Sequence, residues 1–222
     1  MPSNRALVPG EGAAVRAAGV AVLLALAAAA FAGPVDTCRY EYTIWNTNKR
    51  AVSDRRTVSK DRADLSDEER GPLGCTPCRE DQVEVTLRNG LRFLACAKIA
   101  APLGVALDRA IERGQEVSTV VGYRPQMSRG PADKDGNRTE LSNHSFGVAI
   151  DVNEMQNGLY DRCTAWSPAC RLIKGGEYRP GEKGSIVAES PLVGALEAIG
   201  LRWGGQIAGR QKDFMHFSPT GY

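Results

Sequence analysis

The segment SNHSFGVAID, residues 142–151, places a histidine seven positions before an aspartate that interrupts an apolar run. Zinc–ligand bonds are about 2.0–2.2 Å long, so two side chains that share one ion must converge. A straight helix would separate His144 from Asp151 by about 10 Å, and a straight strand by more than about 20 Å. We therefore expect a bend at Gly147, which tolerates a positive φ, followed by a buried strand at 148–152.

A second segment, DFMHF at residues 213–217, holds the other of the two histidines in the chain. Asp213 and His216 are three positions apart, which can put both side chains on one side of the backbone. Asp151, a carboxylate inside an apolar run, needs a partner such as a cation. His144, Asp151 and His216, with a free fourth position, would form the open type of zinc site that enzymes use. Asp213 would then lie close enough to act as a general base toward water at the metal.

Each of these patterns also has a simpler interpretation. Asp151 can be a core acid that pairs with an arginine, and His216 can be a packed histidine in an aromatic patch. Arg124, taken alone, is a surface cation. We favour the metal site because it accounts for both histidines in one three-ligand arrangement.

The composition is that of a globular protein. The 222 residues are 42% hydrophobic and 24% charged, which excludes bulk disorder and predicts one domain with at most a small appendage. The formal net charge is +2, so the chain lacks the strong positive field of a nucleic-acid-binding protein. We expect no nucleic-acid partner.

The N-terminal residues 1–32 have the features of a secretory signal peptide. Arg5 and Arg16 precede an apolar run at 17–32, shorter than the roughly 20 residues of a spanning helix. The run ends in AFA at 30–32, which is typical of a cleavage site. The alternative is an uncleaved, tilted membrane anchor. We expect a periplasmic or secreted protein with no stable membrane insertion after cleavage, and an oxidising compartment in which cysteines form disulfides.

The periodicity of the mature chain predicts an α+β fold, with a small, mostly antiparallel sheet that is flanked by helices and carries the metal site. Asn89-Gly90 between two short runs of alternating polarity predicts a β-hairpin. The other expected elements are helices at 101–113 and 190–200 and strands at 117–121 and 201–203.

Two polar segments are expected to be solvated and without chemistry. Residues 52–71 are highly charged and lack an apolar stripe, which indicates a connector with one short exposed helix. The segment DKDGN, residues 133–137, superficially resembles a calcium loop, but its glycine is fourth and not sixth. We therefore expect a turn there.

The six cysteines fall into two groups. Cys163 and Cys170 flank a short segment and are expected to form a disulfide that closes a surface loop. The four earlier cysteines can pair in three ways, among which the sequence does not choose: Cys38, Cys75, Cys78 and Cys96. A four-cysteine zinc site and a redox centre at the C-x-x-C motif are the alternatives. A redox protein would leave both histidines unexplained.

The pattern S-x-H-x-x-G-x-A-x-D at 142–151, followed by D-x-x-H-F at 213–217, resembles the zinc-dependent D-alanyl-D-alanine carboxypeptidase family. That family includes the L-alanyl-D-glutamate endopeptidases of phage lysins and shares its fold with the hedgehog signalling domain. Gly-Tyr-Arg at 122–124 and Trp-Gly-Gly at 203–205 resemble two further segments of the family. The resemblance covers roughly residues 117–217.

The resemblance implies a role for each matching residue. His144, Asp151 and His216 would hold Zn²⁺, and Asp213 would be the catalytic base. Arg124 would bind and polarise the substrate, and the substrate site would be lined by Ser142, Tyr123 and Trp203. The implied organisation is a signal peptide at 1–32, a disulfide-stapled, Cys-containing extension with a hairpin at 33–99, and a zinc peptidase domain at 100–222.

The function that follows is a zinc metallopeptidase acting on peptidoglycan stem peptides. Its activity would be that of a D-Ala carboxypeptidase or of an endopeptidase that cuts within the stem. Asp213 stands where carboxypeptidases of free dipeptides tend to have Glu, which favours the endopeptidase branch. The alternative, permitted by the hedgehog resemblance, is a zinc-stabilised cell-wall-binding module without turnover. The complete set of ligands and base argues against that alternative.

Overall fold

The computed structural model describes residues 36–222, which lie in one compact unit. The expected signal peptide at 1–32 lies outside the described residues. Within the described part of the chain, no helix has the length and apolar character needed to cross a membrane.

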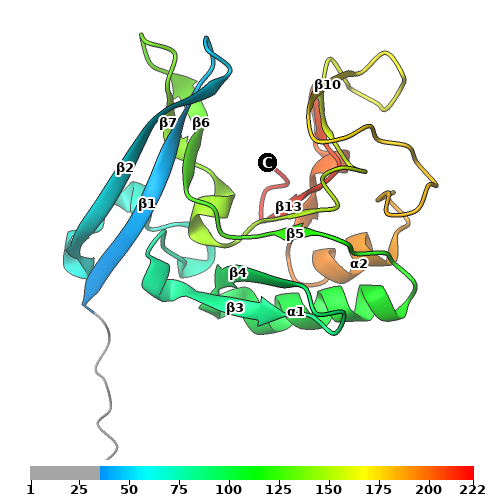
Figure 1. Ribbon diagram of the computed structural model, residues 1–222, viewed down its shortest axis with the longest axis horizontal. Coiled ribbons are helices and arrows are strands. Elements are labelled where there is room, and N and C mark those ends of the chain that lie inside the picture. Colours follow the sequence, from blue (N-terminus) through cyan, green and yellow to red (C-terminus); the bar gives the residue numbers. More distant parts are fainter. Residues whose placement is uncertain (1–35) are drawn as a thin grey trace, which may run out of the picture. The chain divides into compact units, whose positions relative to one another are not determined.

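The unit is α+β, with mostly antiparallel sheets and two α-helices among the described residues (Figure 1). Three sheets have the strand orders β2-β1-β6-β7, β11-β13-β8-β5 and β10-β9-β12, and β3 and β4 form a separate hairpin. The one parallel pairing among the described strands joins β1 to β6. The strands are β1 (Thr37–Asn46), β2 (Ala51–Asp61), β3 (Gln82–Thr86), β4 (Arg92–Cys96), β5 (Val120–Val121), β6 (Gln126–Ala132), β7 (Arg138–Leu141), β8 (Ile150–Val152), β9 (Leu159–Asp161), β10 (Arg171–Lys174), β11 (Arg202–Trp203), β12 (Gln211–Asp213) and β13 (His216–Ser218).

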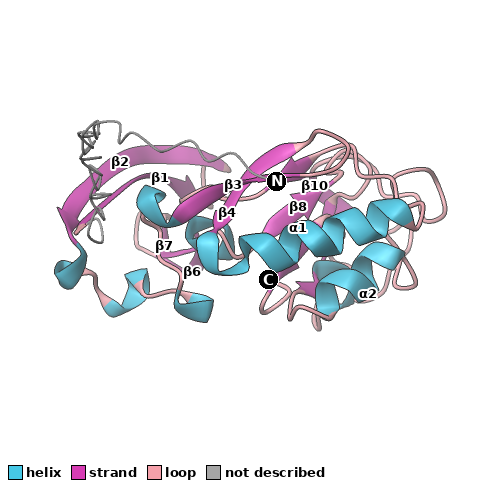
Figure 2. Ribbon diagram, turned by 90° about the horizontal axis from the view of Figure 1, so that it is seen from below, coloured by secondary structure: helices cyan, strands magenta, loops and turns pink. Residues whose placement is uncertain are grey.

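The helices α1 (Ala97–Glu112) and α2 (Pro191–Glu197) lie side by side and supply much of the main core (Figure 2). α1 begins four residues before its predicted start and buries Leu103 and Leu107, which are one turn apart. α2 begins after Ser190, as predicted, and buries Leu192 and Leu196 with the same spacing. Both stripes belong to the cluster that contains residues of β8 and β13, so the helices pack against the sheet that carries Asp151 and His216.

The hairpin predicted at Asn89-Gly90 is present as β3 and β4, and Gly90 has a φ of +87°. The strand predicted at 117–121 is shorter, because only Val120–Val121 pairs with β8. The preceding backbone instead donates from Ser118 N and Thr119 N to Asn153 Oδ1, at 2.8 and 3.2 Å. A buried side-chain amide therefore replaces a strand neighbour at this position.

The prediction for the charged segment 52–71 is wrong in its first half. Residues up to Asp61 form the long strand β2, which pairs antiparallel with β1 along its whole length. Every residue of β2 is exposed or half-buried, so the strand has no apolar face for a sequence pattern to reveal. The pairing comes from the neighbouring strand β1, whose alternate side chains are buried. Only short 3-10 turns follow, at Arg62–Asp64 and Asp67–Glu69.

All six cysteines form disulfides. Cys163–Cys170 closes a loop, as predicted. The C-x-x-C cysteines have separate partners, in the pairs Cys38–Cys78 and Cys75–Cys96. This connectivity excludes both the four-cysteine zinc site and the redox pair. The first bond ties β1 to the turn before β3, and the second ties that region to the start of α1.

The segment expected as an extension shares its sheet with the rest of the unit. β1, from that segment, pairs with β6, and β6 pairs with β7. The loop after β1 also contacts the β6–β7 turn, where Thr47 N donates to Gly136 O at 2.8 Å. The expected boundary at residue 99 lies inside α1, so the structure joins the two segments in one framework.

Candidate metal centre

His144 is placed by the bend that the sequence predicts. It lies in a 3-10 turn, Asn143–Phe146, which ends at Gly147 with a φ of +65°. A Cβ at position 147 would come within 2.0 Å of Gln82 Oε1 and 2.6 Å of the backbone nitrogen of Cys96. Glycine is therefore required for both conformation and space. The chain then enters β8, which carries Asp151.

Strand register places His216 beside Asp151. β13 pairs antiparallel with β8, with His216 opposite Asp151. The turn before β13 is held by Trp203, whose Nε1 donates to the backbone oxygen of Phe214 at 2.8 Å. Ring contact between Trp203 and Phe214, with centroids 5.8 Å apart, fixes the same turn from its apolar side.

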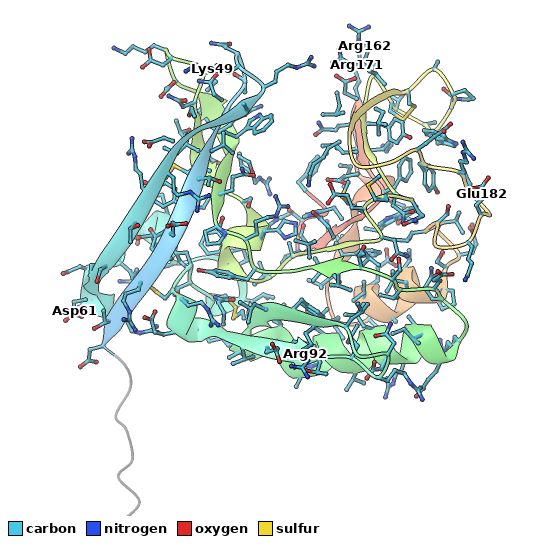
Figure 3. The ribbon with its side chains drawn as sticks, viewed as in Figure 1. Lys49, Asp61, Arg92, Arg162, Arg171 and Glu182 are labelled. Carbon is cyan, nitrogen blue, oxygen red and sulfur yellow. A yellow bond between two sulfur atoms is a disulfide. The ribbon has the colours of Figure 1, made fainter. Side chains whose placement is uncertain are left out.

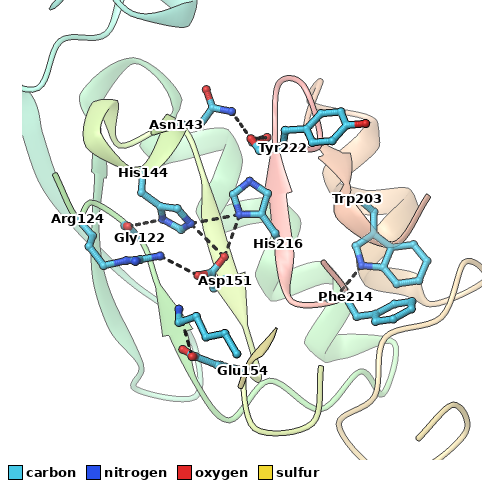
Figure 4. A network of polar contacts seen from close by, with 12 residues as sticks. Gly122, Arg124, Asn143, His144, Asp151, Glu154, Trp203, Phe214, His216 and Tyr222 are labelled. Atoms are coloured by element: carbon cyan, nitrogen blue, oxygen red, sulfur yellow. Dashed lines mark hydrogen bonds and ion pairs between the residues drawn. The ribbon is translucent and has the colours of Figure 1, made fainter. Parts of the chain in front are cut away.

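Three potential ligand atoms converge in the resulting site (Figure 4). His144 Nε2 lies 3.0 Å from Asp151 Oδ1 and 3.2 Å from His216 Nδ1. His216 Nδ1 lies 2.9 Å from Asp151 Oδ1. All three side chains are buried. Atoms bound tetrahedrally to one zinc ion are roughly 3.3–3.6 Å apart, so a small outward relaxation would seat the ion.

The chemistry of these atoms fits a cation. His144 Nδ1 is 2.8 Å from the carbonyl oxygen of Gly122, so the ring proton belongs on Nδ1. The neutral ring then directs the lone pair of Nε2 at Asp151 Oδ1, which is itself an acceptor. Acceptors buried face to face repel one another unless a proton or a metal ion lies between them. Two histidines and one carboxylate are a common ligand set for an open zinc site.

Contacts outside the ligand atoms hold the arrangement in place. Asp151 uses its second oxygen, Oδ2, to accept from Arg124 Nη2 at 3.0 Å. Gly122 and Arg124 both belong to the segment that leads from β5, and Arg124 N also donates to His144 O at 3.0 Å. Such contacts fix the orientation of the side chains, and the hydrogen bond from His144 Nδ1 to Gly122 O raises the basicity of Nε2 of the same ring.

The pKa values of the three ligands are shifted in different directions. Burial lowers the pKa of His144. Burial opposes ionisation of Asp151, but the adjacent imidazoles outweigh it and hold the pKa of Asp151 well below its usual value. Burial also opposes protonation of His216, but Asp151 outweighs it and raises the pKa of His216. In the absence of a metal, the contact with Asp151 therefore favours the protonated form of His216 and the ionised form of Asp151.

Asp213 is the other acid of this site. It ends β12, directly before Phe214, whose backbone oxygen accepts from Trp203, and it lines the same cavity as His144, Asp151 and His216. Its Oδ1 is buried without a hydrogen-bond partner. Burial, with the Asp151 charge adding to it, raises the pKa of Asp213 to about 7. A carboxyl group with this pKa can accept and release a proton near neutral pH.

The site lies in a cleft of about 660 Å³. One wall comes from β6, β7 and Trp45 at the end of β1, and the other from β9, β10 and the segment around β12. In Figure 1 these strands rise on either side of the short sheet that holds β13 and β5. His144, Asp151 and His216 therefore form part of the lining of this cleft.

The structure brings together six of the eight site residues singled out from the sequence. Those that line the cleft are Arg124, Ser142, His144, Asp151, Asp213 and His216. Tyr123 instead donates through its hydroxyl to Pro77 O at 2.7 Å, and Trp203 is buried beneath the Phe214 turn. Neither is among the residues that line the cleft.

Sequence reasoning missed most of the cleft walls. Trp45, Arg129, Arg138 and Lys174 lie in segments without a motif, and they reach the cleft only through sheet pairing. The single available signal was the run of polar residues on either side of the turn at 133–137, which is a pattern common to many solvated hairpins.

The fold and the site together define an α+β protein with a His-Asp-His cluster that could hold a metal ion, and with a buried acid in the same cleft. Residues 135–219 match the family described as D-alanyl-D-alanine carboxypeptidase, a family of zinc peptidases. The match confirms, over this segment, the resemblance seen in the motifs. It contains all three candidate ligands and Asp213, whereas Arg124 lies before it. No curated protein and no solved structure matches the chain.

Proposed function

We propose that the protein is a zinc-dependent peptidase that hydrolyses peptide bonds in the stem peptides of bacterial peptidoglycan. The observation that carries the proposal is the convergence of His144 Nε2, Asp151 Oδ1 and His216 Nδ1 in a cleft that also holds Asp213. The family match over residues 135–219 supports the substrate class. We propose further that its α+β fold is of the hedgehog-like zinc peptidase type.

His144, Asp151 and His216 hold the zinc ion. When bound, zinc polarises the scissile carbonyl and makes water a nucleophile near neutral pH. The carbonyl oxygen of Gly122 accepts a hydrogen bond from His144 Nδ1–H. This contact favours the tautomer of His144 that binds metal through Nε2. Arg124 keeps Asp151 in place through its second oxygen.

Asp213 is the general base and acid. Its carboxylate takes a proton from the attacking water and returns it to the leaving amine, so the group is regenerated in each turnover. The raised pKa of about 7 suits both steps, because a stronger acid would accept the proton poorly. The unpartnered Oδ1 leaves a hydrogen-bonding position available for water.

Arg124 and Ser142 bind the substrate. Arg124 donates a hydrogen bond from Nη2 to Asp151 Oδ2, while its buried Nε has no hydrogen-bond partner among the described residues. The guanidinium retains donors for a carbonyl oxygen that gains negative charge in the transition state. Ser142, at the start of the turn that carries His144, lines the cleft beside it.

Trp203 and Tyr123 act as positioning residues. Trp203 holds the turn between Asp213 and His216 through its hydrogen bond to Phe214 O. Tyr123 anchors the segment of Arg124 to the disulfide-bonded region through Pro77 O. The site is thereby tied to the core on one side and to the extension on the other.

The protein works outside the cytoplasm. Three disulfides among the described residues are typical of an exported chain, and they agree with the signal peptide expected at 1–32. The mature protein is therefore periplasmic or secreted, where it meets peptidoglycan.

Digestion of purified peptidoglycan with the zinc-loaded protein tests the proposal, with products identified by mass. New amines that a chelator abolishes and zinc restores are expected. Loss of one terminal residue would identify a carboxypeptidase, and paired fragments would identify an endopeptidase. Retention on the wall material with no new amine over hours would overturn the peptidase and support a binding module.

A further inference from the structure

Trp45 is a large aromatic side chain that the core does not use. It is half-buried and lines the same cleft as the metal ligands. The other two tryptophans, Trp166 and Trp203, pack with the main hydrophobic cluster and contact neighbouring rings. Among the described residues, Trp45 belongs to no hydrophobic cluster, and its side chain has no ring contact and no hydrogen-bond partner. Folding therefore leaves this ring available to a ligand.

The backbone around Trp45 sets the direction of the ring. Alternate residues of β1 are buried, Ile44 among them, so Trp45 lies on the opposite face of the strand. The register with β2 shifts between Ile44 and Trp45, where the pairing passes over Ser53. Ser53 Oγ donates to Asn137 Oδ1 at 2.8 Å, which ties this β-bulge to the turn before β7. Bulges next to functional sites commonly direct a side chain in this way.

Trp45 lies within reach of a short peptide that is bound at the metal ligands. Thr43 pairs with Gln126 of β6, and the parallel register, continued by two residues, places Trp45 beside Ser128. Ser128 is four residues from Arg124, so the backbone separates these two by at most about 14 Å. An extended peptide covers that span with about four residues.

Polar side chains share this wall with Trp45. Gln126, Ser128 and Arg138 all line the cleft. The hydroxyl of Ser128 has no hydrogen-bond partner among the described residues, and Arg138 uses one nitrogen, Nη1, to donate to Gly130 O. A sugar ring presents a face of C–H groups and a rim of hydroxyl groups. An aromatic face beside hydrogen-bonding side chains suits both parts of such a ring.

The facing wall of the cleft is different in character. Leu159 of β9 and Ile173 of β10 line it and offer apolar contacts without an aromatic ring. Small apolar side chains of a peptide fit that wall better than a sugar does, because it provides fewer partners for hydroxyl groups. The two walls therefore suit the two chemical parts of a glycan-linked peptide.

We propose that Trp45 is a sugar-binding residue that stacks on the sugar carrying the stem peptide, while the peptide extends to the metal ligands. The inference rests on the proposed function for its ligand, because the stem peptides of peptidoglycan are attached to the glycan strand at their amino end. Trp45 lies before the segment that matches the family, residues 135–219. The preference for glycan-linked over free stem peptides is thus supplied by the Cys-containing extension.

Binding of two ligands tests the subsite. One is a disaccharide-linked stem peptide released from peptidoglycan by a muramidase. The other is the same peptide, freed from its sugars by an amidase and acetylated at the new amino group so that the charge is equal. The zinc-loaded full chain carrying Asp213→Asn is titrated with each by calorimetry, so that cleavage does not interfere. We expect the sugar-linked peptide to bind about tenfold more tightly, with a ratio that salt does not change.

Trp45→Ala is expected to bring the ratio of the two affinities close to one, chiefly by weakening the sugar-linked peptide. Trp45→Phe keeps a flat ring and should retain part of the ratio. The matched control is Val52→Ala, which should retain all of it. Val52 is exposed, does not line the cleft, and pairs with Trp45 in the hairpin whose tip carries Lys49 (Figure 3). Near-ultraviolet circular dichroism and melting temperature check that each variant is folded.

Equal affinity of the Asp213→Asn chain for the two ligands would overturn the subsite. An equal loss for both ligands in Trp45→Ala would also overturn it, because the ring would then contact the peptide and not the sugar. Failure of the proposed function is a separate result. In that case the wild-type chain would cleave neither ligand, while the preference for the sugar-linked peptide and its loss in Trp45→Ala would still support the subsite.

Discussion

Asp213 is the residue whose substitution separates catalysis from metal binding. Asp213→Asn preserves shape but removes the proton acceptor, so we expect turnover to fall by about 10²–10⁴-fold. Zinc content should not change, because the three ligand atoms belong to other residues. Turnover is measured by peptide cleavage and zinc content by metal analysis, on the same preparation. The control is Asp161→Asn, a half-buried acid paired with Arg171 outside the cleft, and equal losses in the two variants would refute the assignment.

The pKa of Asp213 also has a consequence for the stability of the metal-free protein. Its value in the folded state, about 7, is above its ordinary value of 3.8. Between these two values the folded state binds a proton that the unfolded state releases. Stability therefore falls as pH rises through this window, by up to about 1.4 kcal/mol per pH unit.

Asp213→Asn removes that dependence because the amide does not titrate. Urea unfolding of the metal-free wild type and of the variant, from pH 5 to pH 8, measures the difference. As pH rises, the free energy of unfolding of the variant should increase relative to that of the wild type. A constant difference across the range would show that the pKa of Asp213 is not raised.

The two histidines cannot substitute for each other. The chain contains no third His, so His144→Ala or His216→Ala leaves two ligands. We expect a loss of zinc affinity greater than the 10–100-fold that is typical when only a supporting contact is removed. Competition with a chelating dye measures it. Unchanged zinc affinity in either variant would mean that the ion is held elsewhere.

At the scale of elements, the bend between the 3-10 turn and β8 is the feature that most restricts which residue can occupy a position. Gly147→Ala must accommodate both a positive φ and a Cβ close to Gln82 and the backbone of Cys96. We expect the variant to lose about 1–3 kcal/mol of stability, and to bind zinc more weakly because His144 moves. Thermal unfolding and zinc titration measure these effects.

Two controls separate the causes of that loss. Gly114→Ala meets the same φ strain, with φ +89°, but no atom lies within 4 Å of the added carbon. Gly194→Ala lies within α2 in open space and should be neutral or stabilising. If Gly147→Ala costs no more than Gly114→Ala, then close packing at the bend is not important.

Elements differ in how much of them could be predicted. The hairpin at Asn89-Gly90, the helix after Ser190 and the bend at Gly147 depend on preferences of adjacent residues, which a sequence displays directly. β2 could not be foreseen, because its charged residues carry no apolar alternation and its conformation depends on pairing with β1. The short length of β5 likewise depends on the side chain of Asn153, which is 34 residues from Thr119.

For the molecule as a whole, the disulfides should contribute unequally to stability. Cys38–Cys78 closes a separation of 40 residues and Cys163–Cys170 one of 7. In the chain-entropy account, a disulfide that closes a longer loop restricts the unfolded chain more. The expected contribution to the free energy of unfolding is about 4 kcal/mol for Cys38–Cys78 and about 2.5 kcal/mol for Cys163–Cys170. Paired serine substitutions, compared by urea unfolding, test the order. A greater loss on removing Cys163–Cys170 would contradict it.

The sequence by itself determined the chemistry that this protein can perform. It specified the histidines, the two aspartates and the glycine between the first two ligands, because these depend on residue type and local conformation. The tertiary structure alone decided that His216 meets Asp151 across 65 residues, which cysteines pair, and that Arg129 and Arg138 line the same cleft as the two histidines. Such contacts depend on strand register and on packing between distant segments, and no local spacing in the chain encodes that geometry.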